Sequence, residues 1–306
     1  MDKKKKIRKK ELFRHGIQTL WAALTNGYLE GYLTGKIYKG NLKQICLPGL
    51  NCYSCVGSLG SCPIGSLQAV IGKKGKLFSF YVFGFLLMIG SVLGRFVCGW
   101  LCPFGLIQDL LNKVPFPRKV RVLPKENVLI KLKYIVLVVF VVLFPIFLVN
   151  DIGNGAPAFC KWICPVGTLE GGIPLVAANE SLQQQAGWLF VWKIILLTVI
   201  LLASIIIYRP FCKFLCPLGA IYSLFNKVSM YRYRVNLDIC IGCGKCKNIC
   251  QMNVDPVKDA NHLECIRCGK CKHSCPVNAI ESSFFKCSSM KSKYDIKLGE
   301  DPNCKE

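Results

Sequence analysis

The feature that most constrains this chain is a short cysteine motif, Cys-x3-Cys-Pro-x-Gly, which occurs at residues 98–105, 160–167 and 212–219. The first and last copies lie in segments that align without gaps, 95–114 on 209–228, and each follows a long apolar run. Two thiols four residues apart share one face of a helix, and Pro can begin a new helix directly after the second thiol. Thiol pairs repeated at the ends of apolar segments predict redox or metal sites at a membrane edge.

The bulk composition indicates a membrane protein with basic loops. The chain has 306 residues, a net charge of +23, 52% hydrophobic residues and 20 cysteines. The basic residues flank apolar runs and do not line one soluble face, so nucleic-acid binding is not expected. The cysteines fall into short-spaced groups, which favours metal or cluster ligation in a reducing compartment over a disulfide framework.

Four segments are expected to cross the bilayer as helices: residues 15–34, 77–94, 127–150 and 187–208. The last three are apolar over enough residues for a core of about 30 Å, whereas the first needs support from a bundle because it carries Glu30 and three glycines. Residues 95–133 hold eight Lys or Arg and residues 151–186 only Lys161. The positive-inside rule therefore places the first loop and both termini in the cytoplasm. Six lysines in residues 35–76 oppose this assignment.

The predicted fold is an α-helical membrane protein, a four-span bundle with pseudo-two-fold symmetry, followed by an α+β 2[4Fe–4S] ferredoxin domain. On the outer side, Cys62-Pro-Ile-Gly parallels Cys164-Pro-Val-Gly, so each half supplies one outer and one inner motif. The halves share one orientation, which places the repeat axis along the membrane normal. The expected domains are a basic cytoplasmic tail at 1–12, the membrane domain at 13–228, the ferredoxin domain at 229–282 and a polar tail at 283–306.

The strongest cofactor signal lies near the C-terminus. Two runs with the pattern Cys-x2-Cys-x2-Cys-x3-Cys occupy residues 240–250 and 265–275. This spacing is typical of ferredoxins with two [4Fe–4S] clusters, in which the fourth cysteine of each run ligates the other cluster. The pattern predicts that cluster one is bound by Cys240, Cys243, Cys246 and Cys275. It predicts that cluster two is bound by Cys265, Cys268, Cys271 and Cys250.

Two further cysteine groups are candidate metal sites. The repeat predicts an inner site formed by Cys98, Cys102, Cys212 and Cys216. Its spacing fits a [4Fe–4S] cluster, another metal, a thiol redox pair or packing cysteines. The outer site comprises Cys46, Cys52, Cys55, Cys62, Cys160 and Cys164, and a disulfide on an exposed face is its alternative. Cys287 and Cys304 are expected to be free thiols.

The expected topology raises a distance problem, because the inner and outer sites would lie near opposite faces of a core about 30 Å thick. One tunnelling step across that distance would be slow. Either the thiols sit deep between the helices, or a quinone or a partner's cofactor bridges them.

With two cytoplasmic Cys-x3-Cys-Pro motifs and an eight-cysteine ferredoxin segment, the chain resembles the NapH/NosR/CcoG-type membrane polyferredoxins over residues 14–280. NapH is the better match, since it also has four spans and ends in a ferredoxin domain. The resemblance implies electron transfer between a quinol or cytoplasmic donor and a redox partner at the outer face. It supports the inner cysteines and the eight ferredoxin cysteines as ligands. The outer cysteines depart from it, and any flavoprotein or reductase would be a separate subunit.

Two functions of different classes follow. The first is an electron-transfer subunit of a membrane oxidoreductase system in the cytoplasmic membrane, not a stand-alone enzyme. The alternative is an accessory metal-handling or maturation factor whose outer thiols bind or reduce copper for a partner metalloenzyme. The sequence has no Cys-x2-Cys-His haem motif, Rossmann fingerprint or P-loop.

Overall fold

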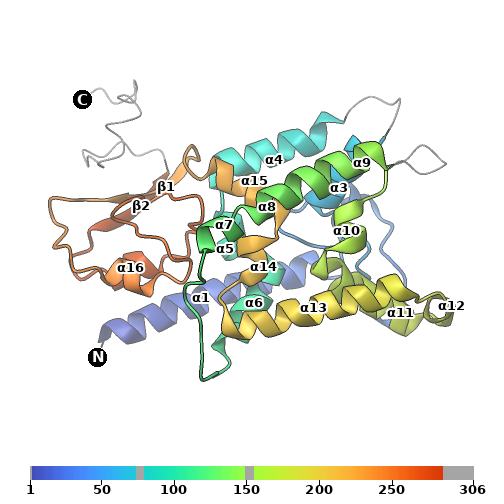
Figure 1. Ribbon diagram of the computed structural model, residues 1–306, viewed down its shortest axis with the longest axis horizontal. Coiled ribbons are helices and arrows are strands. Elements are labelled where there is room, and N and C mark those ends of the chain that lie inside the picture. The colour runs from blue at the N-terminus through green and yellow to red at the C-terminus, as the bar shows by residue number, and fades with distance from the viewer. Residues whose placement is uncertain (1, 74–78, 149–154, 285–306) are drawn as a thin grey trace.

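The computed structural model describes residues 2–73, 79–148 and 155–284. Cys287 and Cys304 and most of the expected polar tail lie outside these residues. Figure 1 shows long helical segments that extend along the length of the molecule, with the ferredoxin segment at one end. They are α1 (Asp2–Thr25), α4 (Phe80–Leu93), the composite helix Glu126–Phe147 and α13 (Trp188–Ile206). The composite helix is built from α7 (Glu126–Leu129), α8 (Leu132–Val136), the π-helical η2 (Leu137–Leu143) and α9 (Phe144–Phe147).

Short helices connect the long ones and fill the space between them. In the first half they are α2 (Leu29–Thr34), the 3-10 helix η1 (Asn41–Gln44), α3 (Pro63–Ile71), α5 (Phe96–Trp100) and α6 (Pro103–Lys113). In the second half they are α10 (Ala158–Trp162), the π-helical η3 (Gly167–Gly172), α11 (Ile173–Ala178), α12 (Glu180–Gln184), α14 (Pro210–Phe214) and α15 (Pro217–Phe225). The inner motifs at residues 98–105 and 212–219 therefore each join two short helices by a turn.

The cysteine motifs begin helices, as their Pro residues predict. Cys102 and Cys216 are extended N-cap residues, and Pro103 and Pro217 are the first residues of α6 and α15. Proline suits that position because its fixed φ matches the helix and its missing N–H would have no partner there. In each motif the second cysteine is thus held at a helix start, against the end of the preceding helix.

The two halves pack reciprocally around the inner motifs. Helix α6 of the first half packs on α1 of its own half and on α13 of the other half. Helix α15 of the second half packs on α8 of its own half and on α4 of the other half. The pseudo-two-fold relation that the sequence repeat predicts is therefore visible in the helix contacts.

Among the described residues, two helices are long and apolar enough to cross a membrane, Glu126–Phe147 and Trp188–Ile206, and α4 is a shorter apolar helix. Their positions agree with three of the predicted spans. The four-span bundle stays a prediction, because length and composition support only two crossings. The basic N-terminal residues continue directly into α1, so the expected tail is part of that helix.

After its exposed basic N-terminal residues, helix α1 is polar on its buried side and apolar on its exposed side. Arg14 and Gln18 are 1% and 0% exposed, whereas Leu12 and Phe13 are 69% and 61% exposed. A water-exposed helix normally has the opposite arrangement. The distribution fits a helix whose outer side contacts lipid and whose inner side contacts the polar groups of a bundle.

The ferredoxin segment has the expected α+β architecture. Strands β1 (Tyr231–Val235) and β2 (Ile280–Phe284) pair antiparallel, with Tyr231 opposite Phe284 and Val235 opposite Ile280. Helices α16 (Lys245–Ile249) and α17 (Lys270–Ser274) pack on each other, and α17 also packs on α1. Met252 and Ile266 belong to the same buried hydrophobic cluster as the membrane-domain cysteines. The segment is consequently seated on the helical domain.

Candidate iron–sulfur sites

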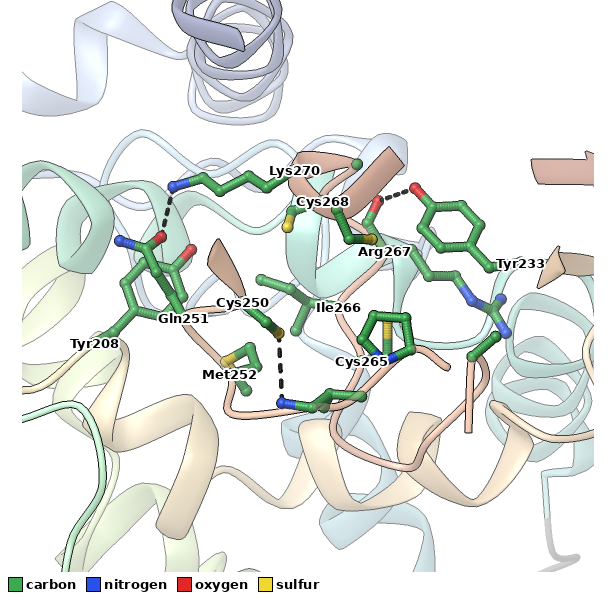
Figure 2. Close-up of a pocket in the computed structure, with 15 residues that line it drawn as sticks. Tyr208, Tyr233, Cys250, Gln251, Met252, Cys265, Ile266, Arg267, Cys268 and Lys270 are labelled. Carbon is green, nitrogen blue, oxygen red and sulfur yellow. Dashed lines mark hydrogen bonds between the residues drawn. The ribbon is translucent and has the colours of Figure 1, made fainter. Parts of the chain in front are cut away.

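The predicted ligands of cluster two lie around one pocket. Cys250, Cys265, Cys268 and Cys271 all line it, together with Tyr208. Figure 2 shows the first three of these cysteines arranged around Ile266. Burial raises the pKa of the Cys265 thiol to about 12, and the neighbouring thiols add to the shift. Iron binding must therefore displace the proton of the Cys265 thiol.

The predicted ligands of cluster one lie closer to solvent. Cys246 is buried on α16, whereas Cys243 is exposed. Burial raises the pKa of the Cys246 thiol, and the nearby Cys240 thiol adds to the shift. The Cys275 sulfur accepts a hydrogen bond of 3.2 Å from the amide of residue 279, and the Cys250 sulfur accepts one of 3.4 Å from residue 254. The last cysteine of each run therefore has the same local geometry, and the complete ligand set of cluster one stays a prediction.

The four inner cysteines converge, as the repeat predicts. Cys98 lies on α5 and Cys212 on α14, while Cys102 and Cys216 are the N-caps of α6 and α15. All four are buried, and Cys216 is within electrostatic range of the other three. The side-chain amide of Gln108 donates to the Cys212 sulfur at 3.1 Å. Buried thiols with N–H donors aimed at sulfur fit an iron–sulfur cluster, whose potential such bonds tune.

Two arginines clamp the inner site reciprocally, and the sequence reasoning missed both. The guanidinium of Arg209 donates to the carbonyl of Cys98 at 2.5 Å, and that of Arg95 donates to the carbonyl of Cys212 at 3.3 Å. Each arginine begins its copy of the repeat and binds the first cysteine of the other copy. The shared Arg at the start of both aligned segments was the signal available in the sequence.

The outer site gathers four of its six predicted cysteines. Cys164 is within electrostatic range of Cys160, Cys52 and Cys62. The side-chain amide of Gln68 donates to the Cys160 sulfur at 3.3 Å, which repeats the Gln108–Cys212 contact of the inner site. Each Gln follows the second or only cysteine of its motif by six residues. The outer site therefore has a donor set that also fits a cluster.

The other two predicted outer cysteines lie apart from Cys164, although Cys55 is within electrostatic range of Cys52. The Cys55 thiol donates to the side-chain carbonyl of Asn26 at 3.6 Å and contacts the Tyr32 hydroxyl. Cys46 forms an isolated β-bridge with Ser61. Both residues are free thiols, as are the four that converge. The ligand set of the outer site stays a prediction, of which the structure brings together Cys52, Cys62, Cys160 and Cys164.

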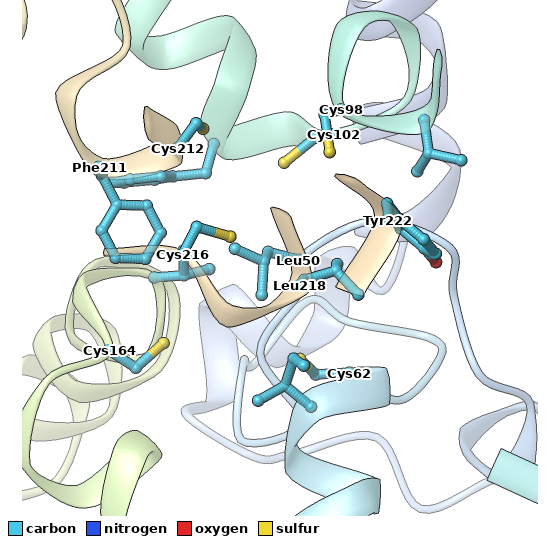
Figure 3. Packing of buried hydrophobic residues seen from close by; sticks show 14 of the residues in the cluster. Leu50, Cys62, Cys98, Cys102, Cys164, Phe211, Cys212, Cys216, Leu218 and Tyr222 are labelled. Carbon is cyan, nitrogen blue, oxygen red and sulfur yellow. The ribbon is translucent and has the colours of Figure 1, made fainter. Parts of the chain in front are cut away.

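The inner and outer sites are adjoining parts of one buried cluster. The loop that leads to the outer cysteines folds back on the inner site, so that a Cβ at Gly49 would lie 3.3 Å from the Cα of Cys102. Figure 3 shows Leu50 and Leu218 between the inner cysteines and the outer pair of Cys62 and Cys164. These residues share one hydrophobic core. The thiols of both sites are buried between the helices, which is the arrangement that the first answer to the distance problem requires.

Cluster two adjoins the inner site on the opposite side. The carbonyl oxygen of Ile266 would lie 2.2 Å from a Cβ at Gly99, so only glycine fits beside Cys98. The indole N–H of Trp100 donates to the carbonyl of Arg267 at 3.0 Å. The loop that carries Cys265 and Cys268 is consequently packed directly against helix α5. Within residues 2–73, 79–148 and 155–284, no three His, Cys, Asp or Glu side chains are grouped as a single-ion metal site.

Comparison with known proteins supports the same chemistry. A 4Fe–4S binding domain model matches residues 61–80, 77–123, 133–173 and 188–234, and a second 4Fe–4S binding domain matches residues 261–281. No solved structure matches the chain. The fold and the cysteine groups thus define an iron–sulfur protein that binds [4Fe–4S] clusters and transfers electrons.

Similar individual proteins give a more specific comparison than the domain matches. An uncharacterised protein of Methanocaldococcus jannaschii is 29% identical over 63% of this chain and 74% of its own length. The methylamine utilization ferredoxin-type protein MauN of Methylorubrum extorquens is 29% identical, and the ferredoxin-type protein NapH of Haemophilus influenzae is 28% identical. Each of these two matches covers 54% of this chain and 50% of the relative. The matching 4Fe–4S binding domains and these ferredoxin-type relatives together support a NapH-like polyferredoxin.

Proposed function

We propose that the chain is an integral-membrane electron conduit that passes electrons between a cytoplasmic donor or the quinol pool and a redox partner at the outer face. The observation that carries this proposal is the unbroken sequence of cysteine sites through the molecule. Cluster one is nearest solvent, cluster two is seated on the inner site, and the inner site shares its hydrophobic core with the outer site. A bound [4Fe–4S] cluster at each site would accept and donate one electron.

The residues between the sites favour short electron-transfer steps. Electron tunnelling weakens steeply with distance and is faster through packed atoms than through gaps. Leu50, Leu218 and Tyr222 are each 2% exposed or less and fill the space between the inner and outer cysteines. Ile266 is 1% exposed and occupies the corresponding place between cluster two and Cys98. The protein therefore excludes water from both junctions.

The outer surfaces of the long helices support insertion in a membrane. Helix α13 exposes Trp188, Trp192, Ile195, Val199 and Leu202. Helix α4 exposes Phe80, Tyr81, Phe83, Leu87 and Met88. Soluble proteins rarely expose contiguous apolar surfaces of this kind to water. Aromatic residues at helix ends suit the lipid interface. We place both termini and the ferredoxin segment in the cytoplasm on the basis of loop charge.

Iron content tests the proposal on protein purified anaerobically. Two ferredoxin clusters alone account for about eight iron atoms per chain, and one more cluster raises the number to about twelve. We expect twelve or more, with a loss of about four iron atoms in the Cys102→Ser/Cys216→Ser variant. A Cys287→Ser variant is the matched control and should keep all its iron. A value near eight in the unmodified protein would overturn the conduit and leave a ferredoxin with a membrane anchor.

A further inference from the structure

Buried charged side chains surround the inner site, and the acidic one in the first half lies within the repeated segment. Asp109 on α6 accepts two hydrogen bonds of 2.6 Å from Arg209, the arginine that clamps Cys98. A second cation, Arg14 of α1, binds the same carboxylate at 2.8 Å. These three side chains are 2% exposed or less. One buried carboxylate thus joins two cations that come from different halves of the chain.

The second half lacks the equivalent carboxylate. The aligned repeat places Ser223 at the position of Asp109. The Ser223 hydroxyl is paired with the Tyr134 hydroxyl at 2.7 Å and leaves Arg95 without an acidic partner from the repeat. With the residues of the repeat alone, Arg95 would be buried without an acidic partner. Burying an unpaired charge is strongly unfavourable.

The ferredoxin segment supplies that carboxylate. Glu264 accepts a hydrogen bond of 2.6 Å from Arg95 and also pairs with Lys133 of α8. Lys133 corresponds in role to Arg14, since each is a cation from the first helix of its half. All three partners are 3% exposed or less. The arrangement Arg95–Glu264–Lys133 therefore reproduces Arg209–Asp109–Arg14, with its acid taken from outside the repeat.

We propose that Glu264 is a positioning residue that completes the second half of the inner site, so that the inner cysteines are fully held only when the ferredoxin segment is docked. Without Glu264, Arg95 and Lys133 would be two buried cations with no acidic partner in this arrangement. Docking of cluster two and ordering of residues 95–99, whose Arg95 clamps the Cys212 carbonyl, are then one event. The link to electron transfer rests on the proposed function, whereas the link between docking and order does not.

Hydrogen exchange of the intact chain in lipid nanodiscs tests this link. In Glu264→Gln we expect backbone amides of residues 263–268 and of residues 95–99 to exchange about a hundredfold faster. Glu264→Asp should retain part of the protection because it keeps the charge. Asp109→Asn is the matched control, and it should loosen residues 209–213 while residues 263–268 stay protected.

A relocated carboxylate separates the two roles of Glu264. In Glu264→Gln/Ser223→Asp, the new carboxylate occupies the position that Asp109 has in the first half. We expect residues 95–99 to regain protection while residues 263–268 continue to exchange rapidly. Wild-type exchange at residues 95–99 in Glu264→Gln would overturn the proposal. So would a double variant in which both segments stay equally fast.

The iron content of the same preparations separates a failure of the electron-conduit proposal from a failure of the Glu264 proposal. If the unmodified protein holds about eight iron atoms, the conduit fails. The exchange data then still decide whether Glu264 couples docking to the order of residues 95–99.

Discussion

The hydroxyl of Tyr222 donates a hydrogen bond of 2.9 Å to the carbonyl of Pro48. This bond ties α15, which follows the second inner cysteine, to the loop that leads to the outer cysteines. Tyr222 is within electrostatic range of Cys98 and Cys102 on one side and of Cys62 on the other. One side chain therefore spans the junction of the inner and outer sites.

Tyr222→Phe should slow electron transfer between the two sites while the fold is kept. The variant loses one buried hydrogen bond, which is worth about 1 kcal/mol, and the loop bearing Pro48 is then less firmly held. Freeze-quench spectroscopy after rapid reduction would measure the rate. Tyr134→Phe is the control, because it removes a tyrosine hydroxyl that bonds Ser223 away from this junction. Equal rates in the two variants would contradict the assigned role.

Gln108→Leu should make the reduction potential of the inner site more negative. The Gln108 amide donates to the Cys212 sulfur, and such a bond stabilises the reduced, more negative state. Loss of about 1 kcal/mol corresponds to roughly 40 mV for one electron. A potentiometric titration followed by electron paramagnetic resonance measures the shift. Gln68→Leu should shift only the outer signal, and a shift of the inner signal in both variants would refute the pairing.

Cys52→Ser should lower the iron content by about four atoms per chain, whereas Cys55→Ser should leave it unchanged. The reason is that Cys52 converges with Cys62, Cys160 and Cys164, while the Cys55 thiol bonds to Asn26. Iron analysis of the two variants, prepared side by side, is sufficient. The assignment of the outer site is wrong if Cys55→Ser loses as much iron as Cys52→Ser.

Gly99→Ala should weaken the seating of the ferredoxin segment. The added Cβ would lie 2.2 Å from the Ile266 carbonyl oxygen, and overpacking of this kind costs about 1–3 kcal/mol. Thermal unfolding followed by the absorbance of the ferredoxin clusters reports the change. Gly84→Ala on α4 is the control, since nothing lies within 4 Å of its Cβ position. An unchanged unfolding midpoint for Gly99→Ala would contradict tight packing of the ferredoxin segment against α5.

The sequence repeat predicted which inner cysteines lie near one another, because symmetry brings equivalent residues together without knowledge of the loops. The helix starts at Pro103 and Pro217 and the convergence of Cys98 with Cys212 all follow from it. Cysteine spacing likewise grouped the four cysteines that line one pocket in the ferredoxin segment.

Two features could not be predicted from the repeat. The loop before Cys52 has no periodic pattern, so nothing in the sequence indicated that Gly49 would pack against Cys102. The pairing of Arg95 with Glu264 joins residues from different domains, at the position where Ser223 breaks the repeat. Irregular loops and contacts between domains depend on tertiary packing, and local spacing carries no signal for them.

The shared carboxylate of Asp109 has a consequence for biogenesis. Its two cations come from α1, near the start of the chain, and from Arg209, which is synthesised only after α13. The hydrogen bonding of Asp109 is thus incomplete until the last long helix has been made. The predicted ligands Cys212 and Cys216 also lie beyond Arg209 in the chain. The second cation of Asp109 and half of the inner thiols therefore become available together, late in synthesis.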